Sequence, residues 1–143
     1  MKIRVLLVDD EQEFVEVLAE RLEVRDIVVT KAFSGDEALA GIKEKSVDVV
    51  ILDVAMPGKD GVATLKEIKQ LNPIIEVIML TGNATVDSAV EGMRLGAYDY
   101  LMKPTETKDL LEKIVKAYKR KTEQEERIRQ AEIERIMQRR GWT

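Results

Sequence analysis

The residues best suited to chemistry in this chain stand at the ends of apolar runs. Two adjacent acids follow the first run and a single acid follows the third, while a threonine and a lysine close the fourth and fifth. These residues are Asp9, Asp10, Asp53, Thr81 and Lys103. If the runs are parallel strands of one sheet, the five side chains converge, because ligands of open α/β sheets bind beyond the carboxyl ends of the strands. The set predicts a site for a divalent cation and a phosphoryl group.

The three acids favour a hard cation. Mg²⁺ takes oxygen ligands in near-octahedral geometry and commonly binds one or two carboxylates. We expect Asp10 and Asp53 to bind it directly, and Asp9 to bind it directly or through water. Without a cation the three carboxylates would repel one another, and such repulsion raises carboxylate pKa values. Taken singly, Asp10 could instead cap a helix and Asp53 could open a turn.

The hydroxyl and the ammonium suit an anionic group. Lys103 is the natural counter-charge for Asp53, or for a phosphoryl group on it. Lys103 precedes Pro104, and an X-Pro bond at a tight turn can be cis, which would fix where the lysine points. The Thr81 hydroxyl can donate to a phosphoryl oxygen. The plainer alternatives are a lysine with a solvated head group and helix capping by Thr81 or Asn83.

Composition excludes several classes of protein. With 143 residues and 45% hydrophobic residues, the chain can form one domain and a short appendage. The absence of Cys and His excludes disulfides, thiolate chemistry and a phosphohistidine intermediate, so any phosphoryl group must come from another molecule. A net charge of −4 argues against direct nucleic acid binding by this chain. The opening run is too short for a signal peptide or a membrane span, so we expect a cytoplasmic protein without membrane contact.

Strand and helix patterns alternate five times along the chain. The continuous apolar runs at 3–8, 27–32, 47–52, 74–80 and 98–102 are typical of strands covered on both faces, and segments with helical spacing lie between them. This order predicts a doubly wound five-stranded parallel sheet with helices on both faces. Predicted N-caps are Asp10, Ser34, Asp60 and Thr107, and Gly96 is the predicted end of a helix.

The composition changes after residue 120. Charges of both signs continue to Arg140, with sparse apolar positions at Ile128, Ala131, Ile133, Ile136 and Met137. We predict a domain over residues 1–120 and a charged helical extension over 121–143 that continues the last helix. The apolar spacing fits a heptad only in part, so the extension either pairs with a second copy or frays.

Several motifs together resemble the receiver domain of two-component response regulators, whose fold is flavodoxin-like. They are Val-Asp-Asp-Glu at 8–11, Leu-Asp-Val-Ala-Met-Pro-Gly-Lys-Asp-Gly at 52–61, Thr-Gly at 81–82 and Tyr-Leu-Met-Lys-Pro at 100–104. The resemblance covers roughly residues 1–120.

The resemblance implies roles for the residues at the strand ends. It implies that Asp53 accepts a phosphoryl group from a histidine kinase or a small phosphodonor, in a reaction that needs Mg²⁺. Asp9, Asp10, Asp53 and the backbone carbonyl of Ala55 are then the metal ligands, and Lys103 and Thr81 bind the phosphoryl oxygens. The implied protein is a signalling domain rather than an enzyme, with only self-catalysed phosphotransfer and slow loss of the phosphate.

A switch also follows from the resemblance, as a hypothesis. Phosphorylation draws Thr81 inward, and Tyr100 follows into the vacated space. The face made by the fourth helix, fifth strand and fifth helix then changes for a downstream protein target. The same face, or the C-terminal helix, could hold a homodimer together.

Three alternatives stay open at this stage. The stretch 83–104 resembles receivers attached to sigma-54-dependent activators, so the chain could be a fragment of such a protein, although we expect a stand-alone receiver. A phosphatase of the haloacid dehalogenase type also uses a strand-end Asp and Mg²⁺, but it needs Asp-x-Asp where this chain has Asp9-Asp10. A flavin-binding module would keep the fold without requiring the acids.

Overall fold

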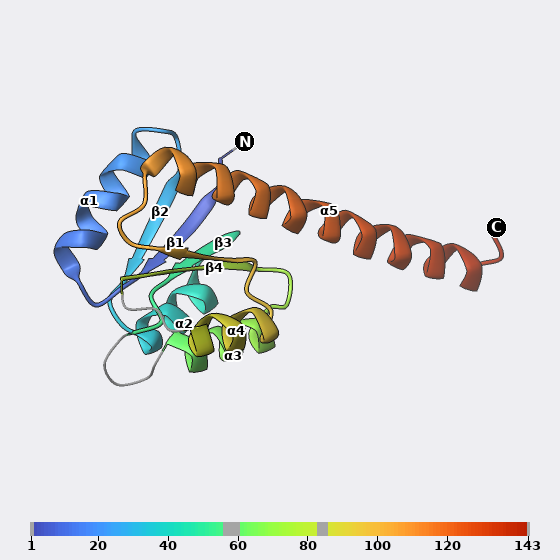
Figure 1. The fold of residues 1–143 in the computed structure, drawn as a ribbon. Helices are drawn as coiled ribbons and strands as arrows, with labels where there is room; N and C mark the ends of the chain where they lie inside the picture. The colour runs from blue at the N-terminus through green and yellow to red at the C-terminus, as the bar shows by residue number, and fades with distance from the viewer. Residues whose placement is uncertain (1, 56–60, 83–85, 143) are drawn as a thin grey trace.

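Five parallel strands form a single sheet in the order β2-β1-β3-β4-β5. The computed structural model describes residues 2–55, 61–82 and 86–142 of the chain. The strands are β1 (Arg4–Val8), β2 (Val28–Ala32), β3 (Val49–Leu52), β4 (Glu76–Thr81) and β5 (Asp99–Met102). Every adjacent pair is parallel. The prediction of a doubly wound five-stranded sheet is therefore confirmed (Figure 1).

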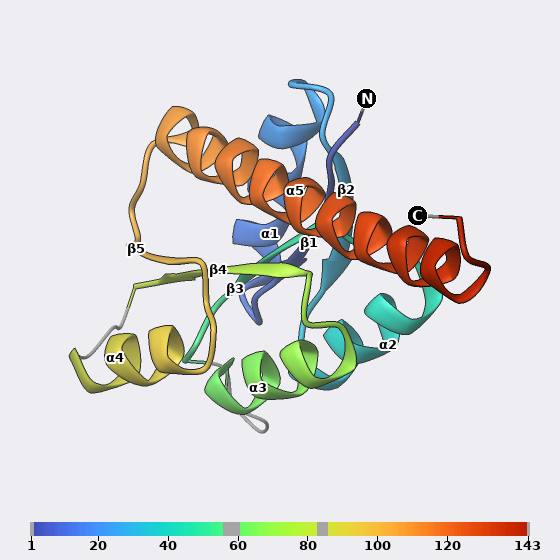
Figure 2. The ribbon, with the colours of Figure 1, turned by 90° about the vertical axis from the view of Figure 1, so that its right-hand side faces the viewer.

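Helices cover both faces of the sheet. They are α1 (Gln12–Glu23), α2 (Gly35–Glu44), α3 (Gly61–Leu71), α4 (Val86–Arg94) and α5 (Thr107–Arg139). Helices α1 and α5 lie on one face, and α2, α3 and α4 lie on the other (Figure 2). Alternate residues of β1 therefore enter different cores: Leu6 and Val8 pack on the α2–α4 side, and Val5 and Leu7 on the α1–α5 side. This is why the strand runs are continuously apolar.

Two of the predicted helix boundaries are confirmed. Ser34 is the N-cap of α2, and its side chain accepts a hydrogen bond from the Glu37 amide at 3.1 Å. Gly96 lies just past the end of α4 with φ of +103°, a conformation that glycine adopts without steric cost.

Two other boundaries were predicted wrongly. The N-cap of α1 is Glu11 rather than Asp10, because the preceding Asp9 carboxylate accepts the Glu11 amide at 3.0 Å. Thr107 is the first residue of α5, and its N-cap is Glu106. The predicted cap at 60 and the capping role suggested for 83 lie outside the described residues.

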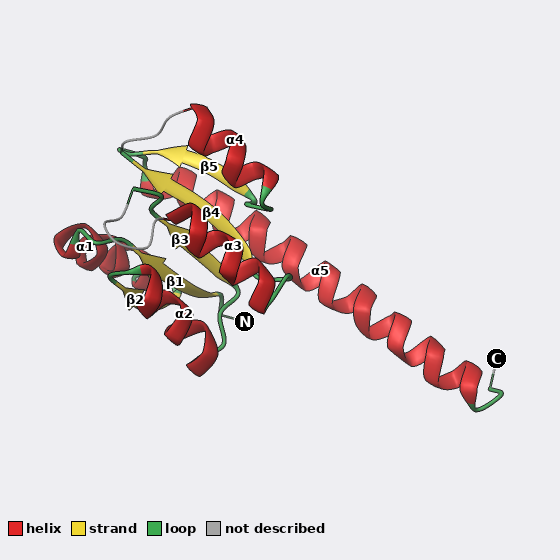
Figure 3. Ribbon diagram, turned by 90° about the horizontal axis from the view of Figure 1, so that it is seen from below, coloured by secondary structure: helices red, strands yellow, loops and turns green. Residues whose placement is uncertain are grey.

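The last helix continues far beyond the sheet. Helix α5 is unbroken over Thr107–Arg139, and its C-terminal turns project away from the other elements (Figures 1 and 3). The predicted helical extension is confirmed. The boundary at residue 120 stays a prediction, and the side chain of Lys121 is still buried.

A buried acid fastens α5 where it leaves the sheet. Asp48, just before β3, is 1% exposed, and Lys121 lies 2.8 Å from its Oδ1. The backbone amide of Arg4 donates to Oδ2 at 2.9 Å, and the Arg4 guanidinium reaches both oxygens at 3.2 Å. Burial alone would raise the pKa of Asp48, but the hydrogen bonds from Arg4 and Lys121 outweigh burial and hold this pKa below its ordinary value.

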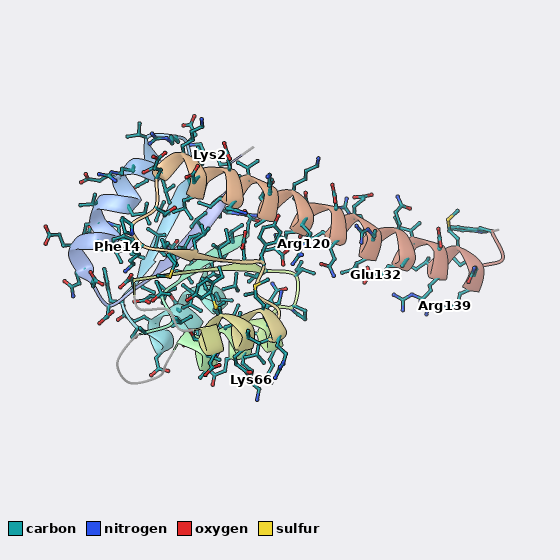
Figure 4. All side chains as sticks on the ribbon, viewed as in Figure 1. Lys2, Phe14, Lys66, Arg120, Glu132 and Arg139 are labelled. Atoms are coloured by element: carbon teal, nitrogen blue, oxygen red, sulfur yellow. The ribbon has the colours of Figure 1, made fainter. Side chains whose placement is uncertain are left out.

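A second buried acid holds the preceding residue of α5. Glu76, the first residue of β4, is 2% exposed and accepts a hydrogen bond from the Arg120 guanidinium. Lys69 Nζ lies 3.6 Å from the other Glu76 oxygen. Arg120 also lies over the Tyr98 ring, 4.7 Å from its centroid. Two neighbouring residues of α5 are therefore tied to the amino-terminal ends of β3 and β4, and Figure 4 labels one of them, Arg120.

Asp48→Asn should lower the free energy of unfolding by about 2 kcal/mol at neutral pH. This is less than the cost for a fully buried pair, because Arg4 is half exposed. The folded-state pKa of Asp48 is lowered, so its contribution is present above the unfolded-state pKa and is lost as the pH falls through the folded-state pKa. Between about pH 5 and pH 3 the wild type should therefore lose more stability than the variant.

Urea denaturation at several pH values measures this effect. Glu123→Gln is the matched control, because it removes an exposed carboxylate from the same helix. If Asp48→Asn and Glu123→Gln gave the same stability at every pH, the clamp would have no energetic role.

Candidate functional site at the carboxyl ends of the strands

The register of the sheet brings the predicted site residues together. Val8 pairs with Leu52, and Thr81 pairs with Met102, so the ends of β1, β3, β4 and β5 share one edge. The backbone continues this alignment past the strand ends. The Asp53 amide donates to the Val8 carbonyl at 2.9 Å, and the Lys103 amide donates to the Thr81 carbonyl at 2.9 Å.

The three acids form one cluster of oxygens. Each of Asp9, Asp10 and Asp53 offers a carboxylate oxygen, and these oxygens all lie within 4.8 Å of one another. Asp9 and Asp53 are buried at 3% and 5% exposure, whereas Asp10 is exposed. Hard oxygen donors at this spacing, with one ligand open to water, fit a Mg²⁺ ion. The Ala55 amide donates to Asp53 Oδ1 at 3.1 Å, so a short turn fixes the Asp53 carboxylate.

Lys103 contacts Asp9 rather than Asp53. Its Nζ lies 2.6 Å from Asp9 Oδ2 and 3.4 Å from Glu11 Oε1, and it sits 4.0 Å from the centroid of the Phe14 ring. The ammonium thus forms two ion pairs and a cation–π contact. We expected the partner to be Asp53 or a phosphoryl group on it; in this structure the ammonium is hydrogen-bonded to Asp9.

The electrostatics of this pair keep the lysine charged. Burial alone would lower the pKa of Lys103, but Asp9, Asp53 and Glu11 outweigh burial and raise it. Burial raises the pKa of Asp9, and the charge of Asp53 adds to this effect, although Lys103 and the Glu11 amide oppose it. A buried carboxylate held in this way gains from any additional positive charge at the site.

The remaining predicted residues flank the acids. Thr81 is fully buried at the end of β4. Gly82 lies beside Lys103, since a Cβ on this glycine would be 3.7 Å from Lys103 Cδ. Tyr100, on β5, packs against the core on the α2–α4 side, and its buried hydroxyl has no hydrogen-bond partner among the described residues. The Lys103–Pro104 peptide bond is cis.

Sequence reasoning missed two residues that position Lys103. Glu11 was noted only as part of the motif at 8–11, and no role in the site was predicted for Phe14. The signal was nevertheless present, because residues three apart share one side of a helix, and Glu11 directly follows the acids at the end of β1. Figure 4 labels Phe14 on α1.

Gly61 is a third residue whose role was missed. It begins α3, and its amide donates to the Val54 carbonyl at 3.1 Å. A Cβ at this position would lie 2.2 Å from Val54 Cα and 2.3 Å from the Asp53 carbonyl oxygen. Because both atoms belong to the backbone, no rotamer change could relieve the clash. The helix therefore packs directly on the segment that carries Asp53.

Comparison with known proteins identifies the family. The model of the response regulator receiver domain matches residues 5–115. The chain belongs to the response regulator receiver family. It is accordingly a receiver domain of the two-component signalling type, as its motifs predicted.

This receiver matches nearly the whole of some solved chains and a smaller part of longer relatives. The transcriptional regulatory protein ZraR of Salmonella typhimurium is 44% identical over 116 residues, which cover 81% of this chain and 26% of ZraR. A receiver domain protein from Methanospirillum hungatei superposes with a TM-score of 0.83 at 30% identity, covering 87% of this chain and 99% of that one. NtrX from Brucella abortus gives a TM-score of 0.82 at 33% identity, covering 88% of this chain and 29% of NtrX.

This receiver spans about a quarter of the length of the curated relatives ZraR and NtrC. Within the described ranges, none of the helices has both the length and the apolar character needed to cross a bilayer. The family assignment makes this chain a signalling domain.

Gly61→Ala should destabilise the receiver by about 2–3 kcal/mol, because overpacking against backbone atoms forces the main chain to shift. Gly41→Ala is the matched control: its Cβ would meet Leu6 Cδ1 at an ordinary 3.6 Å, and within α2 the change should stabilise by about 0.5–1 kcal/mol. Thermal or urea unfolding measures both. Equal effects of the two substitutions would show that the contact at Gly61 places no constraint on the Asp53 segment.

Proposed function

We propose that Asp53 is the phosphoacceptor of this receiver and that a histidine kinase is its physiological donor. The observation that carries the proposal is the placement of a buried Asp53 carboxylate beside Asp9, Asp10 and a charged Lys103. Ionisable groups clustered at one sheet edge, with raised pKa values for Asp9 and Lys103, mark a functional site. The matches to the receiver family support the same assignment.

Charge neutralisation makes the transfer attainable. A carboxylate is a poor nucleophile towards an anionic phosphoryl group unless positive charge offsets the repulsion. Asp9, Asp10, Asp53 and the Ala55 carbonyl would hold Mg²⁺, which supplies part of that charge when it is bound. Lys103, which is paired with Asp9, supplies the rest.

The chemical step forms one bond and breaks one. An Asp53 oxygen attacks phosphorus as the bond from phosphorus to the donor nitrogen breaks, and the donor imidazole keeps that electron pair. Lys103 and the Thr81 hydroxyl then bind the phosphoryl oxygens. Because Lys103 already lies at this edge, it needs only to exchange part of its contact with Asp9 for the new anion.

The switch extends from Thr81 to β5. When the Thr81 hydroxyl turns to the phosphoryl group, Tyr100 moves into the space beside it. The buried Tyr100 hydroxyl gives up no hydrogen bond to a described residue when it leaves. Shifting a two-state equilibrium from 1:99 to 99:1 takes about 5.5 kcal/mol, and several charge-assisted hydrogen bonds of about 1.5–3 kcal/mol each can supply it.

The output is a protein contact on the face made by α4, β5 and α5. Val90, Met93 and Met102 are exposed apolar residues on α4 and β5, and they suit a downstream protein or a second receiver. Relatives named as transcriptional regulators, of which this chain spans about a quarter, favour a second candidate. In that role the receiver would regulate the activity of an attached transcription activator.

Incubation of the chain with Mg²⁺ and acetyl phosphate should add the mass of one phosphoryl group to the wild type and none to Asp53→Asn. Intact-mass spectrometry measures the adduct. Asp36→Asn, which changes an exposed acid on α2, is the control and should be modified like the wild type. Removing Mg²⁺ with a chelator should abolish the adduct. Modification of Asp53→Asn to the wild-type extent would exclude Asp53 as the acceptor.

Thr81→Ala should uncouple phosphorylation from the conformational change. We expect the variant still to form the aspartyl phosphate, because Asp53 and the other acids are unchanged, but to lose most of the NMR shift changes in α4 and β5. Amide spectra of resting and phosphorylated protein provide the measurement, with Thr122→Ala on α5 as the control. If Thr81→Ala preserved the full difference between the two forms, Thr81 would not be the link.

A further inference from the structure

The projecting part of α5 presents a free surface of defined length. Residues 122–139 continue the helix past the clamp at Arg120 and Lys121, over about 27 Å at 1.5 Å per residue. We call this segment, with the Arg140 cap, the arm. Figure 4 labels Glu132 and Arg139 on it. The isoleucines Ile128, Ile133 and Ile136 are 46%, 41% and 46% exposed.

One side of the arm carries an ordered sequence of charges and apolar groups. At about 100° of rotation per residue, the three isoleucines spread over one half of the helix surface. Glu125 and Glu126 lie on the same half at the end near the receiver, and Arg139 and Arg140 lie on it at the far end. This face therefore runs from acid through isoleucine to base.

We propose that the arm binds a second copy of this chain in antiparallel orientation. A parallel pair would set acids against acids at one end and arginines against arginines at the other. In an antiparallel pair, Glu125 meets Arg139 and Glu126 meets Arg140 of the second copy. Because a two-fold axis relates the copies, both contacts form twice. The axis passes near Ile133, which meets its own symmetry mate, and the receivers then lie at opposite ends.

The existing contacts of the two acids do not oppose this pairing. Glu125 lies 3.3 Å from Lys121, and Glu126 lies 3.1 Å from Arg129, both within the same helix. The Glu126–Arg129 pair is exposed, and such pairs contribute little stability. Lys121 is buried but keeps Asp48 at 2.8 Å when Glu125 turns away, so both acids can turn to a new partner. Arg129 and Glu132 interrupt the apolar stripe, and the dimer is accordingly weak and sensitive to salt.

Charge reversal tests the orientation. Sedimentation of the full chain at low salt should show a monomer–dimer equilibrium whose Kd rises about tenfold in Glu125→Arg/Glu126→Arg, and likewise in Arg139→Glu/Arg140→Glu. Combining all four changes should restore the wild-type Kd to within about threefold, because the charges become complementary again. Glu123→Arg/Glu134→Arg makes the same charge change on the opposite side and should dimerise like the wild type.

Cysteine cross-linking then locates the contact. The chain contains no Cys, so only introduced thiols can react. Glu125→Cys mixed with Arg139→Cys should give a disulfide-linked dimer under mild oxidation, whereas either variant alone should stay uncross-linked. Cross-linking of Glu125→Cys with itself would indicate a parallel pair and overturn the proposal. A monomeric wild type at all concentrations, or charge reversals without effect, would overturn it as well.

Discussion

The stability of this structure depends on the positively charged partners of its buried carboxylates. Asp9, Asp48, Asp53 and Glu76 are all nearly inaccessible to solvent, and an isolated ionised carboxylate in such a place is strongly unfavourable. Asp48 and Glu76 lie at the amino-terminal edge of the sheet, and Asp9 and Asp53 lie at the carboxyl edge. The buried carboxylates at both edges need positively charged or hydrogen-bonding partners, but the two edges provide different numbers of them. This difference distinguishes the edge that holds the fold together from the edge that carries the candidate site.

At the amino-terminal edge, the buried carboxylate of Asp48 has enough partners to stabilise its charge. Asp48 receives the Arg4 amide, the Arg4 guanidinium and Lys121, and its pKa is lowered as a result. At the other edge Asp9 receives one ammonium and one amide, and burial together with Asp53 still raises its pKa. A carboxylate with a lowered pKa has enough partners, whereas one with a raised pKa has too few. The sheet edge with too little positive charge is the edge that we propose to bind a cation and a phosphoryl group.

The sequence predicted what local patterns determine. Continuous apolar runs gave the five strands, because strands covered on both faces have no polar side. Ser34 and Gly96 were identified because their preferences act within a few residues. The prediction of Asp10 as an N-cap was wrong, since an acid beside a helix start resembles a cap even when its neighbour Asp9 fixes the turn.

Contacts between distant residues were not predictable from these patterns. Lys121 reaches Asp48 across 73 positions and Arg120 reaches Glu76 across 44, so no local preference marks these pairs. The sequence also did not show that Lys103 meets Asp9, because convergence on one sheet edge leaves the choice among several acids open. Glycine at position 61 gave no signal of its own, as its necessity arises only from the approach of α3 to the backbone at Val54.

One strand connects the two edges. Strand β5 lies at the end of the sheet and, among the described strands, pairs with β4 alone, so fewer backbone hydrogen bonds hold it than hold the central strands. Its carboxyl end leads to Lys103, and Tyr98, just before its amino end, stacks beneath Arg120. Arg120 in turn belongs to the clamp that sets the direction of α5. A shift of β5 along β4 would therefore alter the contact of Arg120 with Tyr98, and the geometry of the clamp provides a physical route from the proposed phosphoryl site to the base of the arm.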